Sequence, residues 1–229
     1  MKCFWKFSLL LVFGLTLSGC SKKETIDDGL TQDIHNIIPD DILAKIYDLG
    51  IEINGGNNPP NIEGIYLVSP NILVMSNFDD SFQPGYRFAD YQYTFSDQNN
   101  SKQTVVCNYN GGNGSDLDVG SGLGAFITGE GNKFSVFIEV RGTLNGAPYK
   151  SVDIYSGEIE TGGIRNWQKV LIMTQEAPNT IKTGQGRLTI DQDRFSGKIT
   201  VQQRQHLQNI LDLPCDVQLL PTAVQSVIN

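Results

Sequence analysis

Alternating apolar and polar residues dominate the chain between residues 64 and 203. In segment 86–95 every second residue from Ala89 to Phe95 is apolar, and in segment 133–141 the same holds from Phe134 to Val140. This period of two places the apolar residues on one face of a β-strand. Further apolar, β-prone runs complete the set of predicted strands, at 64–69, 71–76, 102–109, 117–128, 149–159, 167–175, 186–191 and 198–203.

Clusters of glycine, asparagine and aspartate separate the predicted strands, as in 97–101, 129–132 and 145–148. Such clusters form tight turns, and short connections favour antiparallel pairing over parallel crossovers. We therefore expect an all-β fold over residues 61–204. An antiparallel meander closes into a barrel there or, alternatively, forms a β-sandwich.

Helical spacing of apolar residues occurs before the β region. Ile42, Leu43, Ile46 and Leu49 lie on one side of a helix over residues 39–50, which begins with proline and two aspartates and ends on glycine. This pattern predicts one short N-terminal α-helix. A linker rich in Pro, Gly and Asn follows it and completes the segment 33–60.

The first residues of the chain have the pattern of a secretory signal peptide. Lys2 and Lys6 precede an apolar run over residues 7–17, with no acidic residue before residue 20. A helix needs roughly 20 apolar residues to cross a bilayer, and this run is much shorter. The basic start, the short apolar run and the small residues after it therefore predict a signal peptide over residues 1–19.

The quartet Leu17-Ser18-Gly19-Cys20 resembles the lipobox of bacterial lipoproteins. In that family the chain is cut before the cysteine, and the cysteine carries the lipid. The resemblance implies that Cys20 is the lipid-attachment residue, that the membrane is a partner through this lipid, and that polar residues 20–32 form a tether.

The residues after Cys20 bear on localisation. In lipoproteins an aspartate directly after the cysteine commonly means retention at the inner membrane, and here that position holds Ser21. The resemblance thus implies an outer-membrane lipoprotein of the Bacteroidetes type. Surface-exported members of that group often carry acids directly after the cysteine, whereas Lys22 and Lys23 come first here. Cell surface and periplasmic face both stay open.

The charge balance excludes one class of partner. The whole chain has a formal charge of −8, and removal of residues 1–19 takes away two lysines and no acid, which leaves −10. Nucleic-acid binding requires stripes of Lys and Arg that neutralise phosphates. We therefore expect no nucleic-acid partner.

Two cysteines remain after Cys3 and Cys20, namely Cys107 and Cys215. An exported protein enters an oxidising compartment, so these two are predicted to form a disulfide. The alternative is two buried free thiols. The disulfide would tie the C-terminal tail, residues 205–229, to the β domain on which we expect it to pack. Residues 207–211 within this tail form a short helix on one interpretation.

The stretch 61–66 resembles the opening strand of lipocalin-like proteins, where a G-x-W motif follows a short helical segment. Gly64 matches, and Tyr66 stands in place of the tryptophan. The resemblance implies an eight-stranded barrel whose inward residues line a small-ligand cavity. On the alternative interpretation the same side chains fill the core. The candidate lining residues are Tyr91, Tyr93, Phe95, Phe134, Val136, Ile138 and Trp167.

Motifs for catalysis or metal binding are weak. Residues 111–118 resemble one calcium-binding nonapeptide repeat, but a single copy supplies too few oxygen ligands, and the start of an EF-hand at Asp191 is incomplete. Glu158 and Glu160 point to the same side of a strand and suit either acid–base chemistry or a solvated face. We expect no catalytic residue, no metal site and no cofactor.

These observations favour a non-enzymatic, lipid-anchored envelope protein that binds a small apolar or glycan ligand or a partner protein. A structural or adhesive lipoprotein without a ligand cavity is the alternative, and a carboxylate-based hydrolase is a distant one.

Overall fold

The computed structural model describes residues 30–112 and 117–211. Two helices, α1 (Gln32–Ile37) and α2 (Asp40–Asp48), precede the sheet, and α3 (Val201–Leu211) follows it. None of these described helices has the length and apolar content to cross a membrane. The strands are β1 (Gly64–Val68), β2 (Asn71–Ser76), β3 (Tyr91–Asn99), β4 (Thr104–Gly111), β5 (Asp118–Glu130), β6 (Lys133–Leu144), β7 (Ala147–Glu160), β8 (Gly163–Gln175), β9 (Gly186–Asp191) and β10 (Phe195–Ile199).

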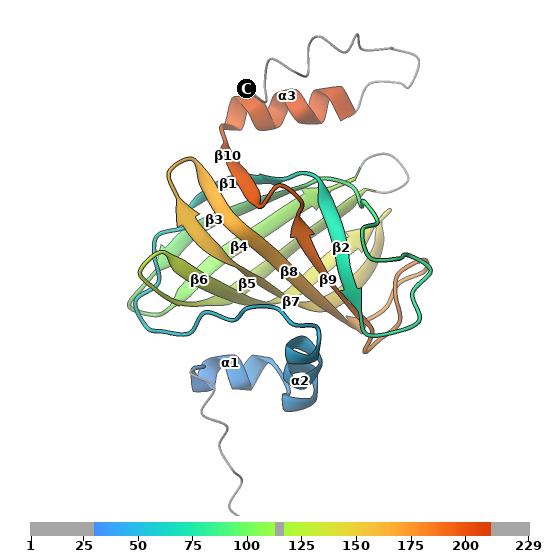
Figure 1. Ribbon diagram of the computed structural model, residues 1–229, viewed down its shortest axis with the longest axis horizontal. Coiled ribbons are helices and arrows are strands. Elements are labelled where there is room, and N and C mark those ends of the chain that lie inside the picture. Colours follow the sequence, from blue (N-terminus) through green and yellow to red (C-terminus); the bar gives the residue numbers. More distant parts are fainter. Residues whose placement is uncertain (1–29, 113–116, 212–229) are drawn as a thin grey trace, which may run out of the picture.

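The strands form one antiparallel sheet that closes on itself (Figure 1). Strands β3 to β9 follow one another as a meander, and β1 joins β3 to β10. Pairing of β10 with β8 completes a ring of eight strands, while β9 and β2 continue outward from β8. The prediction of an all-β meander is confirmed, and the barrel is the alternative that forms.

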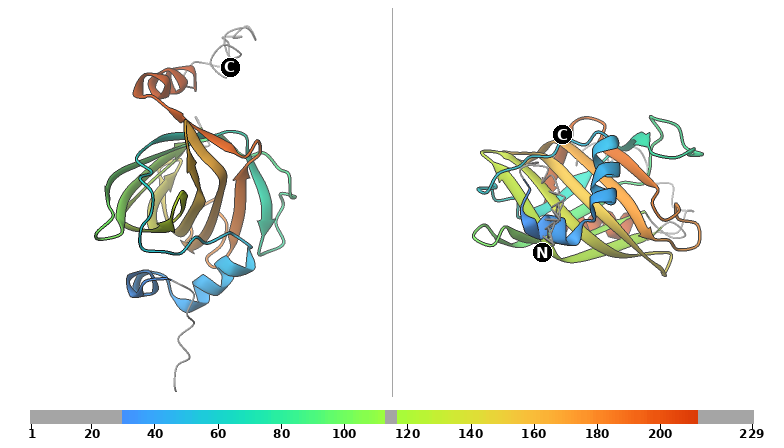
Figure 2. Two further views of the ribbon diagram at one scale, coloured as in Figure 1. Left: turned by 60° about the vertical axis from the view of Figure 1, so that its left-hand side comes forward. Right: turned by 90° about the horizontal axis from the view of Figure 1, so that it is seen from below.

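Helices α1 and α2 pack together on the outside of the barrel, across β6 to β9 (Figure 2). Ile34 and Ile46 are fully buried there and belong to one apolar cluster with Ile154 and Val170, which point outward from β7 and β8. The predicted N-terminal helix is therefore present as α2. Helix α1 was not predicted from the sequence. Apart from one apolar face, its residues resemble those of a polar tether.

Glycines within the strands make room for tyrosine rings on the neighbouring strands. Gly120 lies opposite Tyr109, and Gly142 lies opposite Tyr149, in register across the sheet. A Cβ atom on Gly142 would stand 2.3 Å from Cζ of Tyr149. A side chain at these places would collide with the aromatic ring, so glycine is required. The ring in turn packs over the glycine and stabilises the sheet at that point.

The last predicted strand is partly wrong. Strand β10 ends at Ile199, and α3 begins at Val201 instead of further strand. Thr200 explains the change: its hydroxyl accepts a hydrogen bond from the Gln203 N–H at 3.2 Å, and the Gln203 side chain accepts one from the Thr200 N–H at 2.7 Å. This reciprocal capping box starts a helix. The short helix expected over 207–211 is the end of α3.

Candidate functional site

The predicted ligand cavity inside the barrel is filled by the side chains that were expected to line it. The rings of Tyr93, Tyr155 and Trp167 lie with centroids 4.7–5.5 Å apart, which is close packing. Six of the seven predicted residues are at most 2% exposed, and Tyr91 packs against the same cluster. The structure thus brings the candidate residues together as part of one packed core.

One end of this core carries an ion pair. Nζ of Lys169 lies 3.0 Å from Oδ2 of Asp153, and both side chains are buried. Ser151 donates a hydrogen bond to Oδ1 of Asp153 at 2.6 Å, so the carboxylate has a partner for each oxygen. Burial alone would lower the pKa of Lys169, but the Asp153 charge raises it above its usual value. Both members of the pair therefore have partners within the protein.

Tyrosines surround this ion pair. Nζ of Lys169 lies within 6 Å of four ring centres, which is the range of cation–π attraction. These rings belong to Tyr91, Tyr93, Tyr109 and Tyr155. The position of these rings explains why β3 and β4 are rich in tyrosine. An inward-facing lysine is stabilised by surrounding side chains that are polarisable and can form hydrogen bonds.

A second carboxylate lies near the rim of the same region. Asp118 accepts hydrogen bonds from the hydroxyls of Tyr91 and Tyr149, both at 2.7 Å. Burial raises the pKa of Asp118, and the Lys169 charge opposes that rise. Tyr149 also hydrogen-bonds Tyr109. Every polar group of this interior cluster named here has a partner, which favours a structural role.

Cys107 is a free thiol buried inside the barrel, so the predicted disulfide with Cys215 is not present. Its side chain points inward from β4 and is fully buried among the aromatic residues of the core. Burial raises the pKa of this thiol well above its usual value, so it is unreactive. Cys215 lies outside the described residues, as does Cys20.

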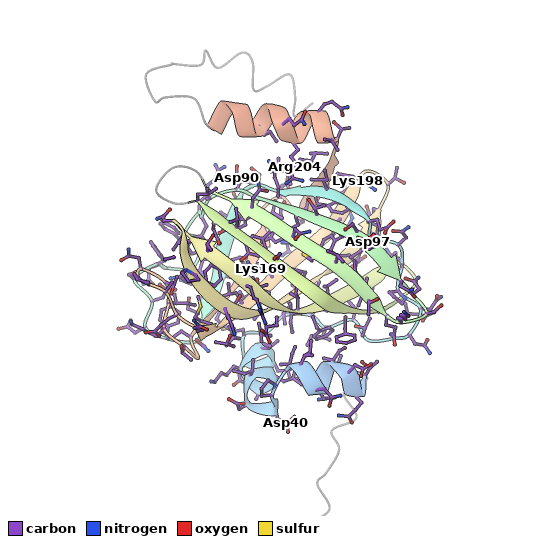
Figure 3. All side chains as sticks on the ribbon, turned by 180° about the vertical axis from the view of Figure 1, so that it is seen from behind. Asp40, Asp90, Asp97, Lys169, Lys198 and Arg204 are labelled. Carbon is purple, nitrogen blue, oxygen red and sulfur yellow. The ribbon has the colours of Figure 1, made fainter. Side chains whose placement is uncertain are left out.

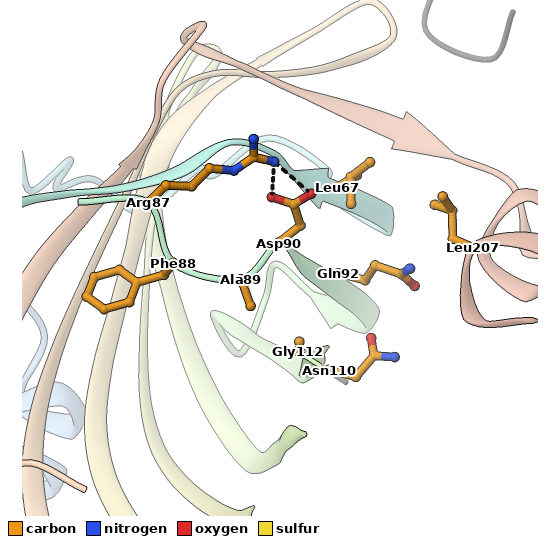
Figure 4. Close-up of a pocket in the computed structure, with 10 residues that line it drawn as sticks. Leu67, Arg87, Phe88, Ala89, Asp90, Gln92, Asn110, Gly112 and Leu207 are labelled. Carbon is orange, nitrogen blue, oxygen red and sulfur yellow. Dashed lines mark hydrogen bonds and ion pairs between the residues drawn. The ribbon is translucent and has the colours of Figure 1, made fainter. Parts of the chain in front are cut away.

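A cleft of about 330 Å³ lies on the outer wall of the barrel, beneath α3 (Figure 4). Its floor is one row of outward-facing residues on three neighbouring strands, in which Gln92 of β3 lies opposite Leu67 of β1 and Asn110 of β4. We call this cleft the outer groove. Its lining residues are Leu67, Arg87, Phe88, Ala89, Asp90, Gln92, Asn110, Gly111, Gly112 and Leu207.

Gln92 is the unusual residue of the outer groove. It is 5% exposed, and its Oε1 has no hydrogen-bond donor among the residues that the structure describes. Figure 4 shows the side chains of Gln92 and Asn110 pointing from the strands toward α3 and Leu207. The sequence analysis missed this group, because it followed the inward aromatic residues of β3 and treated the alternate positions as solvated.

The rim of the outer groove holds a fixed carboxylate. Asp90 accepts hydrogen bonds from the Arg87 guanidinium at 3.2 Å and from the Ser69 hydroxyl at 2.8 Å. Its side chain is 40% exposed, so it remains accessible to a ligand. The groove therefore combines a buried amide, a second amide and an oriented carboxylate with the apolar side chains of Leu67 and Leu207.

The acidic pair noted in the sequence, Glu158 and Glu160, lies among basic side chains of the protein itself. Glu158 lies 4.0 Å from the Lys133 ammonium, and Glu160 accepts two hydrogen bonds from Arg165. Glu160 thus has its own cation, whereas Lys133 lies closer to Glu52, at 3.0 Å, than to Glu158.

The loop motifs do not gather ligands for a metal either. Within residues 30–112 and 117–211, no group of three or more His, Cys, Asp or Glu side chains is placed to hold a metal ion. Residues 113–116 of the nonapeptide-like stretch lie outside the described residues. Asp191, at the β9–β10 turn, receives hydrogen bonds from the Ser69 N–H and the Ser196 hydroxyl on Oδ2, while its buried Oδ1 has no partner among the described residues.

No protein-family model, no curated protein and no solved structure matches this chain. The fold and the groove therefore stand as the basis for a functional proposal.

Proposed function

We propose that this chain is a lipid-anchored envelope protein of the outer membrane that binds a small ligand, without enzymatic activity, in the outer groove. The observation that carries the binding part is the buried Gln92 amide, whose oxygen has no donor within the described part of the chain and lies at a cleft of about 330 Å³. Ligand pockets are commonly several hundred Å³ and place a few polar groups among apolar ones. The packed interior supports the groove over the barrel lumen as the place of binding.

The placement of the groove suits a membrane anchor at Cys20. Helices α1 and α2, with Asp40, lie on one side of the barrel, and Asp90 and Arg204 lie on the opposite side (Figure 3). The ten residues from Cys20 to Leu30 reach at most about 35 Å when extended. A lipid on Cys20 would hold the α1–α2 side toward the membrane and leave the groove facing away from it.

A structural or adhesive role is the second candidate, and a surface group of aromatic residues favours it. Phe82, Tyr86 and Phe88 pack with ring centroids 4.1–5.4 Å apart beside the outer strand β2. Tyr86 and the neighbouring Met75 remain 44% and 45% exposed. Exposed apolar groups of this kind are typical of contact surfaces.

Mass spectrometry of the protein from its own cells tests the proposal in two parts. The N-terminal peptide should begin at Cys20 and carry the mass of a lipid, and Cys20→Ser should release the protein from the membrane fraction. Under native conditions, the wild type should retain a small molecule that Gln92→Leu does not. An unmodified Cys20 contradicts the anchor. A ligand retained equally by Gln92→Leu contradicts the groove.

A further inference from the structure

On the floor of the outer groove, the hydrogen-bonding groups available to a ligand belong to side chains. Strand β3 is paired on both sides, with β1 and β4, so its backbone N–H and C=O groups are used within the sheet. A peptide therefore cannot bind here by adding a strand, which is how extended peptides commonly gain affinity. The groups left for a ligand are the amides of Gln92 and Asn110 and the carboxylate of Asp90.

The unpaired oxygen of Gln92 requires a donor from the ligand. An amide oxygen buried without a partner is costly in the free protein, and a ligand hydroxyl or N–H at Oε1 would remove that cost. Asn110 is the cross-strand neighbour of Gln92, so the two amides stand side by side on the groove floor. Two adjacent amides present both donors and acceptors and match a ligand with adjacent groups that donate and accept.

Charge and apolar surface narrow the ligand further. Among the residues that line the groove, the charges of Arg87 and Asp90 form an ion pair and compensate each other, so the lining is neutral overall and favours a neutral ligand. Leu67 and Leu207 lie beside the polar groups and provide apolar surface on the floor and the cover of the groove. A sugar ring has this combination, because its hydroxyls donate and accept while its C–H faces are apolar.

We infer that the outer groove binds a neutral saccharide, with Gln92 and Asn110 contacting adjacent hydroxyl groups and Asp90 accepting from a further one. This inference rests on the proposed function and specifies its ligand class. In this inference Gln92 contributes to binding through the hydrogen bonds of its amide and not by maintaining the fold.

A binding screen with the full mature protein tests the inference. Soluble mono- and disaccharides form one arm, and medium-chain fatty acids and tripeptides form two others, each followed by chemical shifts of the Gln92 and Asn110 side-chain amides. We expect saccharides alone to shift both amides. Gln92→Leu should weaken the best saccharide at least tenfold, whereas Gln175→Leu, the same change at an exposed glutamine that ends β8, should leave its affinity unchanged.

The outcomes separate the two proposals. Binding of a fatty acid or a tripeptide at these amides, with no saccharide bound, overturns the saccharide inference and leaves the proposed binding function in place. No shift with any of the three arms overturns both. Saccharide binding that Gln92→Leu does not weaken overturns the inference even when the affinity is high. Unfolding curves of both variants exclude loss of fold as the cause.

Discussion

Lys169 inside the barrel and Gln92 on its outer wall are both buried polar side chains, but their surroundings differ. The Lys169 ammonium lies 3.0 Å from the Asp153 carboxylate and is surrounded by tyrosine rings. The Gln92 oxygen lies at a cleft and has no donor among the described residues. One region has every polar group named above satisfied by the protein itself, and the other lacks one partner.

This difference separates a structural site from a binding site. Polar groups that the fold satisfies contribute to one defined packing of the interior and leave nothing for a ligand to do. A polar group that the fold leaves unpaired is costly in the free protein, and a bound ligand removes that cost. The rich interior chemistry of lysine, aspartate and tyrosine is therefore a poor guide to function here, and the single amide is a better one.

Breaking the interior pair should have the largest effect. Lys169→Met leaves Asp153 charged and buried without its cation, and we expect a loss of about 3–5 kcal/mol in the free energy of unfolding. The double variant Lys169→Met/Asp153→Leu should lose less than Lys169→Met alone, because no buried charge remains. Urea unfolding at pH 7 measures both. A single variant as stable as the wild type would show that the pair is not buried in solution.

A buried acid outside both regions should give the protein a distinct pH dependence. Burial, with the charge of Asp193, raises the pKa of Asp191 from 3.8 to about 6. The folded state then binds more protons than the unfolded state between pH 4 and pH 6. The contribution of Asp191 to stability is therefore largest below this window and is lost as the pH rises through it, by about 2–3 kcal/mol at most.

Asp191→Asn should remove this fall, so that the variant gains stability relative to the wild type between pH 4 and pH 7. Unfolding curves recorded at half-unit pH intervals measure the difference. Asp193→Asn is the control, and it should move the transition to lower pH because a neighbouring negative charge is removed. Parallel profiles for Asp191→Asn and the wild type would refute the assignment.

The tyrosine rings inside the barrel predict a smaller, steric effect on stability. Gly142→Ala places a Cβ 2.3 Å from the Tyr149 ring, and overpacking of this kind costs about 1–3 kcal/mol. Gly197→Ala in β10 is the matched control, because a Cβ there meets no atom within 4 Å. Thermal unfolding compares the two variants. Equal midpoints would mean that the ring moves aside freely.

Replacing Gln92 in the outer groove should have the smallest effect on the free energy of unfolding, and in the stabilising direction. Gln92→Leu removes an unpaired buried amide, so the free protein should be unchanged or more stable by up to about 1 kcal/mol. Gln98→Leu makes the same change where the amide accepts from the Ile62 N–H at 2.9 Å and donates to the Pro60 carbonyl at 2.8 Å, and it should destabilise. Denaturant midpoints measure the pair. Destabilisation by Gln92→Leu would show that its amide is satisfied.

Much of the fold follows from short-range patterns. Alternation from Ala89 to Phe95 gives an inward aromatic face, and the glycine and asparagine clusters give antiparallel turns. Helix α2 follows from apolar spacing. The start of α3 was readable too, since Thr200 and Gln203 form the T-x-x-Q pattern of a capping box, although the apolar content of 198–203 pointed to a strand.

By itself, the sequence determines the all-β class, the inward aromatic residues, helix α2 and the lipobox-like quartet that ends at Cys20. These features depend on neighbours within a few residues along the chain. Only the tertiary structure decides that the barrel closes between β8 and β10. It also decides that the inward rings meet in one packed core, and that Gln92 lies buried without a donor among the described residues. Such contacts join residues far apart in the chain, and no local period records which side chains they satisfy.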